Sequence, residues 1–101
     1  MEREDVRQSG KGYCIQVMQI NGDIQEDLFD KSIHIDNISK GGFRFTTDLK
    51  FELEDRVQVI LKFPDNKAKE VLGRICYCED AGSDNSAYGF SVLRGFYHLA
   101  A

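Results

Sequence analysis

Apolar and polar residues alternate along most of this chain. Residues 57–63 (VQVILKF) show the pattern most clearly, and residues 71–78 and 88–93 repeat it. Because every second side chain of a β-strand points to the same face, this period indicates strands that are buried on one side. The pattern predicts six strands, at about residues 13–20, 31–36, 42–47, 55–63, 68–78 and 87–93.

Turn-forming residues separate these segments, at Asn21-Gly22, Gly41-Gly42, 64–66 (PDN) and 81–85 (AGSDN). Six short antiparallel strands in one small domain favour a closed or nearly closed barrel, since closure removes exposed strand edges. Residues 94–101 are the part of the chain that could form a helical turn or two, and we expect their apolar side chains to pack on a barrel mouth.

The charge balance restricts the classes of partner. The chain has 17 acidic and 13 basic residues in 101, a net charge of −4, so bulk affinity for DNA or RNA is not expected. A small anionic ligand held by a few arginines remains compatible with this charge. The N-terminus is charged and no stretch approaches the ~18 apolar residues of a membrane span. We therefore expect a cytoplasmic protein without membrane insertion.

Catalytic and metal-binding patterns have little support. His34 and His98 are the only histidines, and neither has a partner at catalytic spacing. The three cysteines do not have zinc-ligand spacing and are expected to be reduced thiols packed as small hydrophobes. The acidic residues of 21–30 lack the spacing of a calcium loop. The chain is therefore not expected to be an enzyme. The alternating aromatic residues are expected in the core: Phe43, Phe45, Phe63, Tyr77, Tyr88 and Phe90.

The segment 36–43 (DNISKGGF) carries the strongest candidate chemistry. On an extended backbone Asn37 and Ser39 point the same way, and their amide and hydroxyl groups can hydrogen-bond either a ligand or the turn backbone. Gly41 and Gly42 permit positive φ and allow a flat ligand to approach the main chain. These residues alone leave open an ordinary strand–turn–strand whose turn is capped by polar side chains.

A second motif, Arg3-x-x-x-Arg7, precedes the first strand. Together with 37–42 (NISKGG), it resembles the two signatures of the PilZ family, an N-terminal R-x-x-x-R and a later [D/N]-x-S-x-x-G. The order, the spacing and the strand count agree, and residues 88–93 are similar to the last barrel strand of that family. The resemblance implies a six-stranded antiparallel barrel at 13–93, a mobile arginine arm at 1–12 and a short helical tail at 94–101.

The resemblance also implies a ligand, the bacterial second messenger cyclic di-GMP. Carried over to this chain, Arg3 and Arg7 would contact phosphates and guanine edges, and Asn37 and Ser39 would bind one guanine. Gly42 would leave room for the guanine ring. Lys40 would add unspecific charge. The arm would become ordered on binding, and its new position would signal to a partner protein or to a fused domain.

Two functions follow from this resemblance. The first is a cyclic di-GMP receptor and adaptor, which the presence of both Arg3 and Arg7 favours. The alternative is a protein-interaction module that binds no nucleotide, because some PilZ domains lack the arginines and act through partners alone. A barrel that binds single-stranded nucleic acid is less favoured, since such a protein needs basic residues between its surface aromatics.

Overall fold

The computed structural model of the chain describes residues 8–95. One 3-10 turn, η1, is the only helical element within this range, and the remaining elements are strands. The bounds are β1 Gln8–Ser9, β2 Cys14–Ile20, β3 Asp23–Ile24, η1 Glu26–Leu28, β4 Ile33–Ser39, β5 Gly42–Thr47, β6 Arg56–Lys62, β7 Ala68–Gly82 and β8 Asn85–Arg94.

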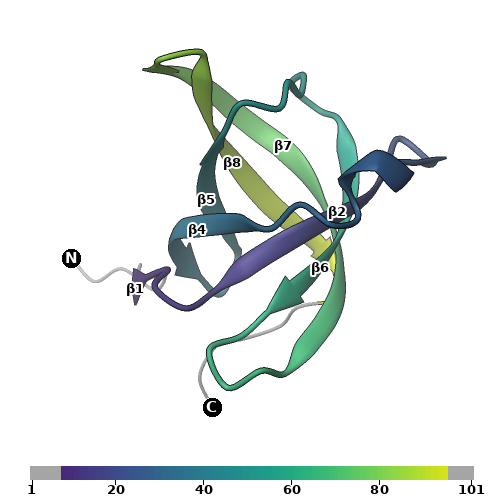
Figure 1. Cartoon of the computed structure of the whole chain (residues 1–101), viewed down its shortest axis with the longest axis vertical. Helices are drawn as coiled ribbons and strands as arrows, with labels where there is room; N and C mark the ends of the chain where they lie inside the picture. Colours follow the sequence, from purple (N-terminus) through teal and green to yellow (C-terminus); the bar gives the residue numbers. More distant parts are fainter. Residues whose placement is uncertain (1–7, 96–101) are drawn as a thin grey trace.

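Six of the strands form a closed antiparallel barrel (Figure 1). Their order around the barrel is β4-β5-β8-β7-β6-β2, and β2 pairs back with β4 through Cys14 opposite His34 and Ile15 opposite Ile33. The short strands β1 and β3 extend the sheet by pairing with β4 and β2. The expected all-β, six-stranded antiparallel barrel is confirmed.

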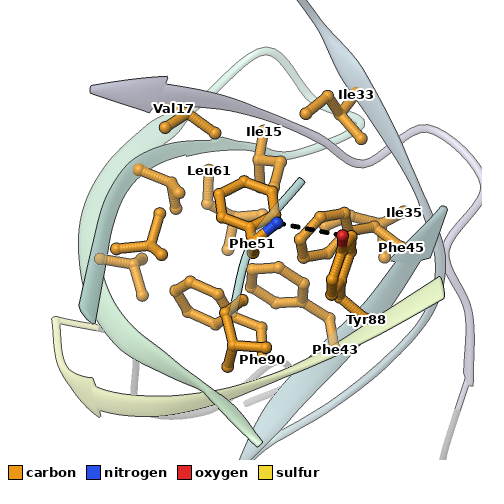
Figure 2. Close-up of a cluster of buried hydrophobic side chains, with 14 of the residues drawn as sticks. Ile15, Val17, Ile33, Ile35, Phe43, Phe45, Phe51, Leu61, Tyr88 and Phe90 are labelled. Carbon is orange, nitrogen blue, oxygen red and sulfur yellow. Dashed lines mark hydrogen bonds between the residues drawn. The ribbon is translucent and has the colours of Figure 1, made fainter. Parts of the chain in front are cut away.

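The inward-facing residues of these strands build one core. Figure 2 shows the aromatic part, in which Phe43 stacks on Phe90 at 4.4 Å between ring centroids. Phe51, from the loop between β5 and β6, also enters this cluster, and its backbone N–H donates to the Tyr88 hydroxyl at 3.0 Å. That hydroxyl donates in turn to the Leu49 carbonyl at 3.1 Å. These two bonds fasten the loop over one end of the barrel.

The hairpin between β7 and β8 is longer than the sequence pattern suggested. The strands continue to Gly82 and from Asn85, so Ser83 and Asp84 alone form the turn. Both have positive φ, 51° and 66°, which is the geometry of the tight hairpin turns that match strand twist. The turn therefore lies within the predicted turn segment 81–85 and consists of two residues.

Three further expectations need correction. The helical tail at 94–101 is not supported, because Arg94 still belongs to β8 and residues 96–101 lie outside the described range. Cys76 and Cys78 are exposed and not packed in the core. Tyr77 is 37% exposed, because a bulge between Ile75 and Tyr77 shifts the alternation and turns its ring outward.

Within residues 8–95, no helix has the length and apolarity of a membrane span.

Candidate ligand-binding site

The motif of residues 37–42 lies in the hairpin between β4 and β5. Ser39 pairs with Gly42 across the ladder, so Lys40 and Gly41 form the turn. Lys40 is exposed, whereas Ser39 is only 1% exposed. The Ser39 hydroxyl donates to the Gly42 carbonyl at 3.4 Å, which is longer than a typical hydroxyl hydrogen bond of about 2.7 Å. This contact is therefore a weak one.

The two glycines of the motif have different roles. Neither has positive φ, so the expectation that they supply a left-handed conformation is wrong. A Cβ on Gly42 would lie 2.0 Å from the Phe90 carbonyl oxygen, whereas a Cβ on Gly41 would meet nothing within 4 Å. Gly42 is therefore required because β5 and β8 approach closely at this point. Gly41 contributes its carbonyl oxygen, which accepts the Val92 N–H at 3.0 Å.

A β-bulge turns the polar motif residues outward. Ile35 and Ile38 both face the core although they are three positions apart, because the register shifts between Ile35 and Asn37. The extra residue re-aims the side chains that follow it. Asn37 consequently lies half-buried on the outer face of the barrel, opposite Arg44, and Ser39 alternates to the same side but is buried there.

Outward-facing residues cross four strands of the barrel beside the motif, in two rows. We call these residues the motif face, and we read each row from β4 through β5 and β8 to β7. The first row is Ser39, Gly42, Ser91 and Arg74. The second row is Asn37, Arg44, Gly89 and Tyr77. A Cβ on Gly89 would lie 2.6 Å from the Tyr77 ring, so this ring lies over Gly89. The first row therefore has small residues at Ser39, Gly42 and Ser91, while the second row carries Arg44 and the Tyr77 ring.

The two arginines of the motif face are held differently. Arg74 makes a close contact with Glu54, with its Nη1 atom 3.2 Å and 3.0 Å from the two carboxylate oxygens. Arg44 lies between two carboxylates at longer range, 3.8 Å from Asp36 and 4.0 Å from Glu79. Ion pairs at this range and exposure contribute little to stability. Arg44 is therefore the more available of the two cations.

The segment that carries the R-x-x-x-R motif reaches the barrel next to the motif face. Arg3 and Arg7 themselves lie outside the described residues. Gln8, the residue after Arg7, pairs with Ile38, and Ser9 pairs with Asn37. The sequence did not predict this short strand, because the polar run 8–12 has neither alternation nor apolar residues.

Sequence reasoning also missed most of the motif face outside the hairpin. The position of Arg44 between Phe43 and Phe45 did carry a signal, since alternation places it outside. Tyr77 carried none, because the bulge before it depends on pairing with β8. Within residues 8–95, no cluster of three or more His, Cys, Asp or Glu side chains could hold a metal ion.

Fold and site together define a class: a six-stranded antiparallel barrel with a polar hairpin motif on its outer face. Comparison with family models identifies the family within this class. The model of the PilZ domain matches residues 3–95, so the chain belongs to the PilZ family. This family is known for binding cyclic di-GMP, and its members are receptor or adaptor modules rather than enzymes.

A solved structure supports the fold. The Bacillus subtilis inhibitor of motility, MotI/DgrA, superposes with a TM-score of 0.68 at 18% sequence identity. The alignment covers 93% of this chain and 43% of that chain, so this chain spans less than half the length of that protein. At this identity the similarity shows the barrel fold and nothing further. Comparison with curated proteins gives no match.

Proposed function

We propose that this PilZ domain is a receptor for cyclic di-GMP, which binds on the motif face. The observation that carries the proposal is the outward placement of Asn37 beside Arg44, next to a row of small residues at Ser39, Gly42 and Ser91. The segment that follows Arg7 pairs with β4 at this same place. The chain therefore joins the barrel beside the hairpin half of the family signature directly after the R-x-x-x-R motif, whose own residues lie outside the described range.

The chemistry of the face fits a cyclic dinucleotide. The ligand has two flat purine rings with donors and acceptors on their edges and two phosphates with negative charge. Asn37 offers a half-buried amide that can donate and accept, whereas the Ser39 hydroxyl is buried and would have to leave its weak bond to the Gly42 carbonyl to reach a ligand. Gly42 has no side chain to keep a ring away from β5, whereas Gly89 is already covered by the Tyr77 ring. The planar guanidinium of Arg44 can pair with phosphate oxygens or with guanine O6 and N7.

In this proposal Arg3 and Arg7 complete the site from the N-terminal arm. Each would form charge-assisted hydrogen bonds to phosphate or guanine, worth roughly 1.5–3 kcal/mol apiece. Ordering the arm offsets part of this energy and changes the surface that the domain presents. That change would be read by an effector protein or a fused domain. Lys40 adds positive charge at the turn without a specific contact.

Isothermal titration of the full chain with cyclic di-GMP tests the proposal, with GMP and GTP as controls. We expect saturable binding in the micromolar range, which corresponds to about −8 kcal/mol. Arg7→Ala should lose this binding and keep the melting temperature of the parent, because Arg7 precedes the barrel strands. Undiminished affinity in that variant would show that the R-x-x-x-R motif has no part in the site.

A second candidate is an interaction module that binds no nucleotide. Three carboxylates support it, because Asp36 and Glu79 lie near Arg44 while Glu54 holds Arg74. This negative charge weakens the field that an anionic ligand meets at the motif face. A folded chain that gives neither binding heat nor a shift in melting temperature at high cyclic di-GMP would favour this second function.

A further inference from the structure

The strand β7 extends well past the strand that pairs with it on one side. Pairing with β6 ends at Arg56 opposite Arg74, while pairing with β8 continues to the turn. Ile75 is still covered on the β6 side, because its N–H donates to Asp55 and its carbonyl accepts from Glu54, at 3.0 Å and 2.8 Å. Figure 1 shows the hairpin of β7 and β8 projecting from one end of the barrel.

Beyond Ile75 this side of β7 is an open strand edge. Among the residues that the structure describes, none forms a backbone hydrogen bond to the side of Cys76–Ala81 that faces away from β8. All six of these residues are exposed. Alternate N–H and carbonyl groups along such an edge are free to pair with a further extended chain, which is how strand addition binds peptides.

The surroundings of the edge are acidic. Residues 75–93 contain no Lys, Arg or His, whereas Glu79, Asp80 and Asp84 all lie in the projecting hairpin. Glu52 and Glu54 add two exposed carboxylates on the loop that covers Ile75. Arg44 lies 4.0 Å from Glu79, Arg74 lies 3.0 Å from Glu54 and Lys50 donates to the Asp84 carbonyl, so these five carboxylates face three cations and the balance stays negative. The field at the edge therefore favours a positively charged partner.

Two exposed apolar side chains lie in the same region. Leu53 is 58% exposed, and it directly precedes Glu54, whose backbone N–H donates to the Ile75 carbonyl. Tyr77 is 37% exposed and belongs to the edge strand itself. An added strand could pack apolar side chains here on one face while its basic side chains meet the carboxylates, because alternate residues of a strand point to opposite faces.

The same charges disfavour a second copy of this chain as the occupant. Antiparallel pairing of two β7 edges would bring Glu79 and Asp80 of both copies into one short ladder. Like charges on neighbouring strands are destabilising, and charged residues commonly keep exposed edges from self-association. The partner that fits is therefore an extended segment that alternates basic and apolar residues.

We propose that the edge of β7 at Cys76–Ala81 is a docking site for a basic, extended segment of a partner protein. The segment adds a strand to the hairpin through main-chain hydrogen bonds, and its Lys or Arg side chains pair with Glu79 and Asp80. The inference deepens the adaptor part of the proposed function by naming the chemistry of the partner. The docking itself requires no nucleotide, so it is tested separately from ligand binding.

The test is fluorescence anisotropy of the full chain with a labelled synthetic peptide that alternates lysine and valine. We expect saturable binding in the absence of cyclic di-GMP, and none to the matched peptide that alternates glutamate and valine. Hydrogen exchange of the amides in 76–81 should slow when the lysine peptide is bound, since strand addition protects edge amides. Absence of binding to both peptides would overturn the proposal and show that the carboxylates only guard the edge.

A pair of charge-reversal variants separates the edge from overall charge. E79K/D80K should weaken binding of the lysine peptide at least about tenfold. The control E26K/D27K makes the same change in net charge on the exposed turn η1, and it should bind like the parent. Equal weakening by the two variants would overturn the proposal in favour of unspecific attraction. If the parent chain binds the lysine peptide but does not bind cyclic di-GMP, the receptor proposal is contradicted and the docking proposal is not.

Discussion

The hairpins β4–β5 and β7–β8 both turn through two residues, but their surroundings differ. The β4–β5 hairpin is paired on both sides, with β1 along β4 and β8 along β5. The outer part of the β7–β8 hairpin has no partner strand among residues 8–95 on the β7 side beyond Ile75. A paired hairpin holds its side chains in fixed positions, whereas a projecting one opens at lower free energy. The first suits recognition of a small rigid ligand and the second suits contact with another chain.

The largest effect that this comparison predicts is at the paired hairpin. Gly42→Ala should destabilise the domain by about 3 kcal/mol, because its methyl group would lie 2.0 Å from the Phe90 carbonyl oxygen and would force β5 and β8 apart. Gly41→Ala is the matched control, since nothing lies within 4 Å of its methyl position. Urea unfolding of both variants measures the difference. Similar stability of the two variants would mean that the close contact at Gly42 is absent in solution.

A smaller effect is expected on ligand affinity at the motif face. Arg44→Ala should weaken cyclic di-GMP binding about thirtyfold, or about 2 kcal/mol, because it removes a charge-assisted contact. Its partners Asp36 and Glu79 are exposed, so we expect stability to change little. Lys62→Ala removes the same charge from the outer face of β6 and serves as the control in the titration. Equal affinities for the two variants would remove Arg44 from the site.

The sequence predicted the barrel strands well wherever alternation is uninterrupted. The expected strand at 42–47 matches β5, the one at 13–20 differs from β2 by one residue at its start, and the one at 55–63 differs from β6 by one residue at each end. These predictions succeeded because the alternation that marks a strand with one buried face can be read from each segment separately. The polar strand β1 has no such pattern, and its pairing with β4 could not be predicted from residues 8–9 alone.

The candidate site was predictable only where a signal lies within one continuous segment. Its hairpin residues were found because the motif is contiguous, but the bulges before Asn37 and Tyr77 were not. A bulge depends on how two distant segments align, and one extra residue reverses every later side chain. The steric requirement at Gly42 could not be predicted on the same grounds, because the group that it must avoid belongs to Phe90 on another strand.

The smallest effect concerns the turn of the projecting hairpin, where Ser83 and Asp84 both have positive φ. Replacing them by Asn and Gly, which adopt this geometry readily, should stabilise the hairpin by about 0.5–1 kcal/mol. Because the outer hairpin can open without unfolding the barrel, we expect slower hydrogen exchange in 77–87 and little change in urea unfolding of the whole domain. The double substitution Asn21→Ser/Gly22→Ser at the turn between β2 and β3 is a control that should leave exchange in 77–87 unchanged. Equal stabilisation of the hairpin and of the whole domain would show that the hairpin unfolds only together with the barrel. The two hairpins would then differ in shape and charge but not in local stability.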